Sequence, residues 1–344
     1  GLRLVRLMND PPPAELGFAP APGAIYGRMA LGGARVVTIG TSGWGGDGAF
    51  IPANAALYDT EDPARPRYLS DITLETDTQT LRPWGDNLLL GEARTDPTPL
   101  TGSLRVIGLV GPAAGSEVGR LLGATRAIAV EGNRAYTIRA CGGRVQPTAT
   151  PDPQLAGLPS DIQPPPIMMD TDPAYPDCLA VVDLSDPSQP RLITEREMPP
   201  RAYPHAIAAC NGFVYMPLAD QGILVADARG ADGPEFLGTR AATHMDYPFL
   251  LDNFDEGGLL DVVVNGSMLY FANHTTIAAF DLSTPADPVP VAALELGPTS
   301  YIDRFLFSGG CMHVVTGRRI VGLDDQRFTL WAIEAPADRA ELER

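Results

Sequence analysis

The sequence predicts an all-β protein that is built from a repeated unit of four strands. One observation is a strand, Asp, Pro-turn, strand segment that recurs along the chain, with a tight Gly/Asn hairpin before most of its copies. A second is the lack of any apolar run with the 3.6-residue spacing of a long helix. The 36 glycines and 34 prolines among 344 residues supply the turns that many short strands require.

The first repeated segment is an apolar strand that ends near an Asp, followed by a Pro-containing turn and a second apolar strand. Its clear copies are ALYDTEDPARPRYL at 56–69, AVVDLSDPSQPRLI at 180–193, LVADARGADGPEFL at 224–237 and AAFDLSTPADPVPV at 278–291. Weaker copies lie at 4–16, 105–115 and 330–342. Because proline presets a turn and cannot donate to a sheet, each copy predicts two strands joined by a turn.

The second repeated segment has the pattern of a β-hairpin, with Gly or Asn at the turn. Its copies lie at 29–39, 81–90, 128–138, 207–216, 262–271 and 306–315. Together the two segments make a four-stranded unit of about 40–55 residues, which is the period of a β-propeller blade. We therefore predict a single β-propeller domain over residues 1–344.

The number of blades has two alternatives. Six hairpins favour a six-bladed propeller, in which the strand at Leu2–Met8 closes the ring as the outer strand of the last blade. Seven Pro-type turns favour a seven-bladed one, which would need chain upstream of Gly1. The pattern predicts strands without saying which of them pair at the closure, so both stay open.

The Asp-Leu-Ser-Asp-Pro segment at 183–187 and the Gly-Asn-Arg-Ala-Tyr segment at 132–136 resemble the LVIVD-repeat family of bacterial β-propellers. The resemblance covers nearly the whole chain. It implies an exported or surface propeller, and it implies no single shared reaction. We expect an extracellular or periplasmic location, and a start at Gly1 without Met fits a processed exported protein or a trimmed chain.

The charge composition excludes several partners and mechanisms. All 25 basic residues are Arg, so a lysine Schiff base, a P-loop lysine and a kinase lysine are impossible. A net charge of −17 argues against nucleic acid and against an anionic membrane surface. No apolar run is long enough to span a membrane, so we expect no membrane insertion.

The long connections are expected on one face of the propeller, called here the top face. They lie at 41–54, 94–102, 142–177 and 242–258, in the connections that this architecture places at the start of each innermost strand. Long loops on one face of a rigid repeat scaffold are the usual place for binding or catalysis. We therefore look for the functional site at this end of the strands.

Counting residues back from each hairpin turn gives the start of the innermost strand of each unit, which lies at the mouth of the central channel of a propeller. Arginines and tyrosines occur at or near these positions. These residues are Tyr26, Arg28, Arg82, Arg126, Tyr203, His205, Tyr301 and Arg304. Arginine forks bind carboxylate, sulfate or phosphate with two hydrogen bonds, and a recessed group of them attracts anions. The pattern predicts a pocket for an anionic small molecule or an acidic glycan. The alternative is that each arginine pairs with a channel carboxylate such as Asp261 or Asp303.

Three classes of function stay open at this mouth. The first is a binding module that uses the arginines, with the tyrosines as stacking walls. The second is a lyase or isomerase, in which an arginine neutralises a substrate carboxylate and His205 or Tyr203 removes a proton. The third is a scaffold that binds a protein partner on its top face, with the arginines as structural pairs.

Metal binding has a weak signal. The four histidines do not share one strand register, so a propeller-axis metal centre is not expected. Asp252 and Asp255 lie in a stretch rich in oxygen ligands that lacks the spacing of a calcium-binding EF-hand loop. We expect no cofactor, with calcium at these two residues as the alternative.

Cysteine positions make a sharper prediction. Cys141 ends the second strand of a unit and Cys178 begins the third, so neighbouring antiparallel strands bring them within disulfide range. A disulfide between them would indicate an oxidising compartment. Cys210 and Cys311 belong to different units and are expected to be buried thiols.

Overall fold

A computed structural model describes backbone and side chains for residues 34–39, 55–74, 80–93, 102–141, 177–200, 202, 204, 206–218, 222–240, 262–272 and 277–293. It describes strand backbone alone for residues 2–6, 14–19, 29–32, 43–44, 50–51, 78–79, 94, 101, 261, 276, 294–295, 300–308, 311–318 and 327–334. Within the residues that the structure describes, no helix is long and apolar enough to cross a membrane.

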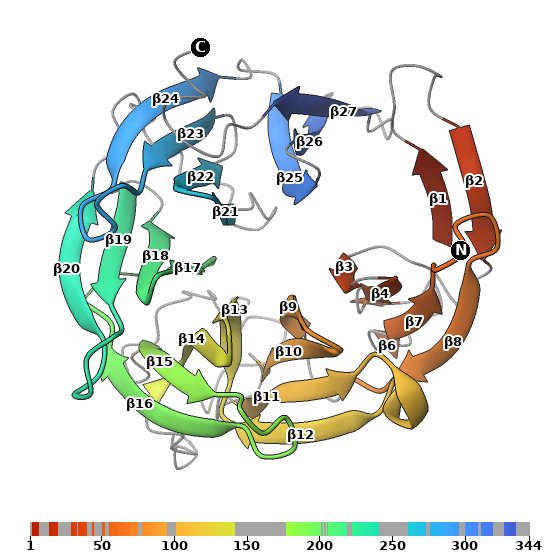
Figure 1. Ribbon diagram of the computed structural model, residues 1–344, viewed down its shortest axis with the longest axis horizontal. Helices are drawn as coiled ribbons and strands as arrows, with labels where there is room; N and C mark the ends of the chain where they lie inside the picture. Colours follow the sequence, from red (N-terminus) through yellow and green to blue (C-terminus); the bar gives the residue numbers. More distant parts are fainter. Residues whose placement is uncertain are drawn as a thin grey trace, which may run out of the picture. The chain divides into compact units, whose positions relative to one another are not determined.

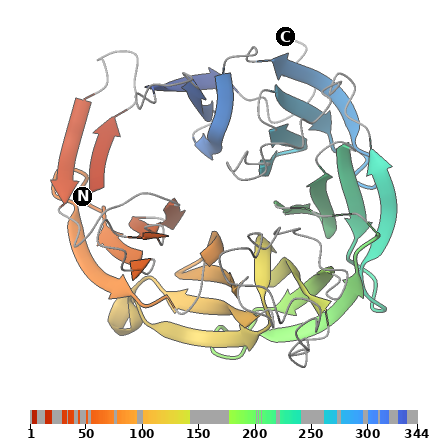
Figure 2. The same ribbon diagram turned by 180° about the vertical axis from the view of Figure 1, so that it is seen from behind.

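Five sheets of the described chain have four strands each, and in every sheet the strands lie side by side in chain order (Figure 1; Figure 2 from behind). Each sheet is named here by its first and last strand. The strands are β3 (Met29–Gly32), β4 (Arg35–Ile39), β7 (Ala55–Asp59) and β8 (Arg67–Ile72); β9 (Thr78–Trp84), β10 (Asn87–Arg94), β11 (Thr101–Gly108) and β12 (Glu117–Leu122); β13 (Thr125–Glu131), β14 (Arg134–Ala140), β15 (Asp177–Asp183) and β16 (Arg191–Glu197); β17 (Ala208–Cys210), β18 (Phe213–Leu218), β19 (Gly222–Asp227) and β20 (Glu235–Arg240); β21 (Asp261–Asn265), β22 (Met268–Ala272), β23 (Thr276–Asp281) and β24 (Val289–Glu295).

The other described elements are smaller. A three-stranded sheet contains β25 (Ser300–Ser308), β26 (Cys311–Arg318) and β27 (Arg327–Glu334). Two further sheets have two strands each: β1 (Leu2–Arg6) with β2 (Ala14–Ala19), and β5 (Gly43–Trp44) with β6 (Phe50–Ile51). One short 3₁₀ turn, η1 (Gly111–Ala113), precedes β12.

The prediction of an all-β chain of four-stranded units is confirmed. The six expected hairpins are the pairs β3–β4, β9–β10, β13–β14, β17–β18, β21–β22 and β25–β26. The predicted closure of the ring by the strand at Leu2–Met8 stays a prediction: β1 pairs with β2, and β27 pairs with β26 among the described strands. The first copy of the Asp-Pro segment, at 4–16, thus forms its own antiparallel pair.

The chain divides into two compact units, each made of several segments. The first contains Gly1–Arg126, Arg139–Cys178 and Asp183–Leu192, and the second contains Ala127–Ile138, Leu179–Val182 and Ile193–Arg344. The boundary passes through the β13–β16 sheet, so it does not decide whether residues 1–344 form one domain. That prediction stays a prediction.

Each hydrophobic core takes residues from two consecutive sheets. In the first unit, Leu57 of β7 packs in one cluster with Leu88 of β10 and Ile107 of β11. The second unit has one core from the β13–β16 and β17–β20 sheets and another from β17–β20 and β21–β24. The inner strand β18 is buried at every position, whereas the outer strand β16 has no fully buried residue. Burial on both faces explains the continuous apolar runs of the inner strands.

The repeated Asp has a local structural role. In four sheets it ends the third strand and accepts a hydrogen bond from the backbone N–H two residues later, at 2.8–3.0 Å. The four residues are Asp59, Asp183, Asp227 and Asp281. This is the Asx turn that Asp forms at strand ends, so the repeated sequence segment is explained by turn formation.

Candidate functional site

The residues predicted to line the mouth are described to different extents. Arg82 and Arg126 have described side chains, and Tyr301 and Arg304 lie on β25, where only the backbone is described. Tyr26, Arg28, Tyr203, His205, Asp252 and Asp255 lie outside the described residues. Arg82 donates from Nη1 to the carbonyl oxygen of Leu81 at 3.4 Å and has further contacts. The site is therefore built from Arg126.

The predicted disulfide is confirmed. Cys141 and Cys178 are bonded, with Cα atoms 5.0 Å apart and a separation of 37 positions along the chain. Cys178 lies on β15 and is buried, whereas Cys141 follows β14 and is half-buried. The disulfide joins the two strand ends between which residues 142–176 run.

Arg126 forms an ion pair with Asp177 at this end of the β13–β16 sheet. Its Nη1 donates to Asp177 Oδ2 at 3.1 Å. The Arg126 side chain is 30% exposed and that of Asp177 is 6% exposed. The sequence placed Asp261 and Asp303 beside the arginines and did not single out Asp177. Its signal was its position directly before the disulfide cysteine, at the end of a long insertion.

The backbone around Arg126 is tied to β14. The Ala140 N–H donates to the carbonyl oxygen of Ala124 at 3.2 Å, two residues before Arg126. Arg139 Nη2 donates to the carbonyl oxygen of Leu122 at 2.7 Å and lies over Gly123, where a Cβ would come within 2.0 Å of it. The segment that leads into β13 is therefore held at two points by the end of β14, which favours a rigid position for Arg126.

The guanidinium of Arg126 uses a different nitrogen from those of Arg120 and Arg229, which each hold a carboxylate bidentately. Arg120 holds Glu117 with Nε and Nη2 at 2.8 and 2.7 Å, and Arg229 holds Asp227 with the same two nitrogens at 2.9 and 2.7 Å. These two nitrogens form the side-on fork that binds a carboxylate bidentately. In the described part of the chain, Arg126 binds only through Nη1, so its side-on fork has no partner there.

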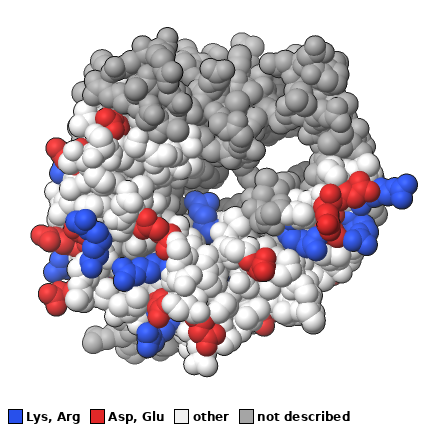
Figure 3. Space-filling view, viewed as in Figure 1, with Lys and Arg blue, Asp and Glu red and all other residues white. Residues whose placement is uncertain are grey.

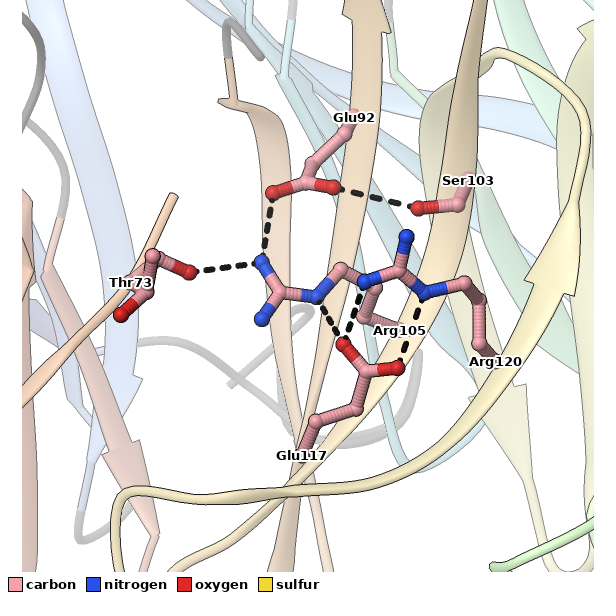
Figure 4. Close-up of polar contacts among 6 residues, drawn as sticks. All are labelled: Thr73, Glu92, Ser103, Arg105, Glu117 and Arg120. Atoms are coloured by element: carbon pink, nitrogen blue, oxygen red, sulfur yellow. Dashed lines mark hydrogen bonds and ion pairs between the residues drawn. The ribbon is translucent and has the colours of Figure 1, made fainter. Parts of the chain in front are cut away.

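A second arginine, Arg105, lies in a buried polar network that the sequence did not predict (Figure 4). Its Nε donates to Glu117 Oε2 at 2.6 Å, and its Nη1 donates to Glu92 Oε1 at 2.9 Å. Nη1 also donates to the carbonyl oxygen of Thr73, which follows β8, at 2.7 Å. The network therefore connects strands β10, β11 and β12 to the preceding sheet.

Each charged residue of the network around Arg105 has an oppositely charged partner, so the network does not resemble a reactive site. Glu92, which is 1% exposed, also accepts a hydrogen bond from Ser103 Oγ at 3.1 Å. The hydrogen bond from Arg120, with that from Arg105, lowers the pKa of Glu117 against the opposing effect of burial. Two arginines and two glutamates balance in charge, so we assign the network a structural role.

A glutamate of the second unit holds a turn of the next sheet. Glu131, at the end of β13, accepts the backbone N–H groups of Asn211 and Gly212 at 2.5 and 2.8 Å. Asn211 has a φ of 54°, in the left-handed region that Asn tolerates at a hairpin turn. The sequence predicted the hairpin turn at Asn211–Gly212 but did not predict that Glu131 binds its N–H groups.

The described residues offer little for metal or thiol chemistry. They contain no group of three or more His, Cys, Asp or Glu side chains placed to hold a metal ion. Burial raises the pKa of the half-buried Cys210 thiol, which keeps it protonated and unreactive. The predicted buried thiol at Cys210 is thus half-buried, and Cys311 has only its backbone described.

Acidic and basic side chains are mixed on part of the described surface (Figure 3). On the face seen in Figure 3, acidic and basic side chains of the described residues lie next to one another. Ion pairs between partly or fully exposed side chains include Arg229 with Asp227 at 2.7 Å and Arg191 with Asp183 at 3.0 Å. Over this part of the surface the charge is mixed, so recognition is expected to depend on individual side chains.

Comparison with known proteins identifies the fold. No family model matches the sequence, and no curated protein matches it. A periplasmic gluconolactonase of Pseudomonas aeruginosa is 14% identical, with a TM-score of 0.55 over 90% of this chain and 85% of that one. A protein of Lactobacillus plantarum is 9% identical, with a TM-score of 0.60 over 96% and 90% of the two chains. Hydrazine synthase of Kuenenia stuttgartiensis is 10% identical, with a TM-score of 0.52 over 90% and 83%.

These structures are β-propellers, and the chain has their fold. At such low identity the likeness concerns the fold alone. The functions of the three proteins are varied, so they do not select one for this chain.

Proposed function

We propose that the protein is an exported β-propeller binding module whose Arg126 receives the oxyanion of a small molecule or an acidic glycan. The observation that carries this proposal is the side-on fork of Arg126, which has no partner among the described residues. Arg120 and Arg229 of the same protein hold carboxylates with this fork. An incoming carboxylate would find the same two donors at the partly exposed Arg126.

The ion pair of Arg126 with Asp177 favours ligands that fit the hydrogen-bond geometry of the guanidinium. Asp177 already neutralises much of the guanidinium charge, since the two groups form an ion pair. A free anion is therefore attracted less by net charge than by two parallel hydrogen bonds, whose donors a flat carboxylate fits well. We expect carboxylates to bind better than sulfate.

The experiment is a thermal-shift and calorimetric titration with D-glucuronate, succinate and sulfate. A ligand that binds only the folded state raises the melting temperature by mass action. We expect a carboxylate-dependent rise in the wild type that is absent in Arg126→Ala. Arg191→Ala is the matched control, because Arg191 pairs with Asp183 through Nη2 at 3.0 Å and the charge change is the same. Equal shifts in wild type and Arg126→Ala would overturn the proposal.

A protein-binding scaffold is the second candidate, and one observation favours it. Arg126 contacts a carboxylate, as an arginine with a purely structural role would. If the protein is such a scaffold, no small anion shifts the melting temperature of the wild type. The titration above therefore distinguishes the scaffold from the anion-binding module. A lyase or isomerase would use Tyr203 and His205, which lie outside the described residues.

The finer features of the fold belong to the same proposal. We place the chain near the LVIVD-repeat propellers, with an extracellular or periplasmic location that the Cys141–Cys178 disulfide supports. Of the two blade numbers that the sequence left open, six and seven, we propose seven. The support is that the Asp-Pro segment at 4–16 forms the pair β1–β2, as the corresponding segment at 56–69 forms β7–β8.

A further inference from the structure

We infer that Asp177 is a positioning residue for Arg126, and that the Cys141–Cys178 disulfide holds Asp177 in place for this role. The inference rests on the proposed function of Arg126 as the oxyanion contact. It assigns to Asp177 the task of orienting the guanidinium so that the side-on fork faces the ligand. Asp177 itself makes no contact with the ligand in this proposal.

The contacts form a closed ring around the site. Starting from Arg126, the ring passes through its hydrogen bond to Asp177, the peptide bond to Cys178 and the disulfide to Cys141. It returns through Ala140, whose N–H donates to the carbonyl oxygen of Ala124. Ala124 lies two residues before Arg126 in the chain. Every link is a covalent bond or a hydrogen bond, so the position of Asp177 is fixed relative to the backbone of Arg126.

The choice of nitrogen decides what the ion pair does. Had Asp177 taken Nε and Nη2, as Asp227 does with Arg229, the carboxylate of Asp177 would have filled the fork. Because Asp177 takes Nη1 instead, it restrains the guanidinium and leaves the fork open. An arginine that is already restrained loses less conformational entropy when a ligand binds, and this raises the affinity.

A matched pair of variants separates positioning from charge. Asp177→Asn keeps an acceptor oxygen for Nη1, whereas Asp177→Ala removes it, and both variants remove the same negative charge. We expect Asp177→Ala to bind D-glucuronate about tenfold more weakly than Asp177→Asn, the cost of ordering one long side chain. Equal affinities in the two variants, both being folded by circular dichroism, would overturn the inference.

The disulfide is tested on the same scale. The variant Cys141→Ser with Cys178→Ser is expected to bind D-glucuronate several-fold more weakly at a temperature where it stays folded. Equal affinity of this variant and the wild type would overturn the role given to the disulfide. Asp177→Asn lacks the negative charge of Asp177, whereas the double serine variant keeps it. Tight binding in Asp177→Asn together with weak binding in the double serine variant would therefore be incompatible with a purely electrostatic role of Asp177.

A measurement without ligand tests the role of Asp177 separately from the proposed function of Arg126. The Nε–H signal of Arg126 in a ¹⁵N spectrum, assigned by its loss in Arg126→Ala, reports how firmly the side chain is held. We expect a sharp signal in wild type and Asp177→Asn and a broadened one in Asp177→Ala. If D-glucuronate fails to bind the wild type, the proposed function fails, whereas this spectrum still decides whether Asp177 positions Arg126.

Discussion

Glu131 holds Gly212 across 81 residues of the chain. Its Oε2 accepts the backbone N–H of Gly212 at 2.8 Å, and its Oε1 accepts the neighbouring N–H of Asn211. Glu131 ends β13 and the two N–H groups belong to the turn between β17 and β18. One carboxylate therefore connects the innermost strand of one sheet to the first hairpin of the next.

Replacing Glu131 tests this connection. We expect Glu131→Ala to lower the free energy of unfolding by about 1–3 kcal/mol, because the buried Gly212 N–H loses a charged acceptor. Urea denaturation followed by circular dichroism measures the change. Glu197→Ala, at an exposed position of β16, is the control and should change the free energy by less than about 0.5 kcal/mol. A matching loss in both variants would contradict the connecting role.

Arg105 is expected to be the most sensitive charged residue of its sheet. Arg105→Ala leaves Glu92, which is 1% exposed, without its positive partner, at a cost of about 3–5 kcal/mol. Arg120→Ala removes a half-exposed partner of the same network and should cost about 1 kcal/mol or less. Urea denaturation of both variants checks this order, and a larger loss for Arg120→Ala would refute it.

The paired Glu117 predicts a loss of stability in acid. Its pKa in the folded protein is lowered from the ordinary value of 4.5, chiefly by the hydrogen bond from Arg120. A carboxyl whose folded pKa is lowered stabilises the protein above its unfolded pKa, and this contribution is lost as the pH falls through the folded pKa. We expect Glu117→Gln to show a shallower decline of the unfolding free energy below about pH 4.5 than the wild type. Parallel declines would contradict the assignment.

The disulfide should contribute substantially to stability. A bridge across 37 residues restricts the unfolded chain by about 3–4 kcal/mol in the chain-entropy model. We expect a lower urea midpoint after reduction, and a cross-linked peptide containing Cys141 and Cys178 in mass spectrometry of the unreduced protein. Finding these two cysteines in separate peptides without reductant would contradict the structure.

Features that depend on neighbours in the chain were predictable from the sequence. The hairpin turn at Asn211–Gly212 and the Asx turn at Asp183 are each formed within a few residues, so the residue types alone indicate them. The Cys141–Cys178 disulfide was also predictable, because both cysteines flank one insertion between adjacent strands. Arg126 was singled out by its register, and its function as an anion contact stays a prediction.

The partners of the charged side chains depended on the tertiary structure. Arg105 pairs with Glu92 because both lie on the same face of adjacent strands, and with Thr73 because the preceding sheet packs there. Gly212 meets Glu131 only once two sheets are stacked. The pattern of strands and turns was thus determined by the sequence itself, since it follows from local backbone preferences and apolar periodicity. Packing between strands and sheets decided which arginine has its side-on fork filled by a carboxylate and which keeps the fork open. Hydrogen bonds depend on distances between atoms in the folded protein, and the spacing of residues in the sequence does not contain those distances.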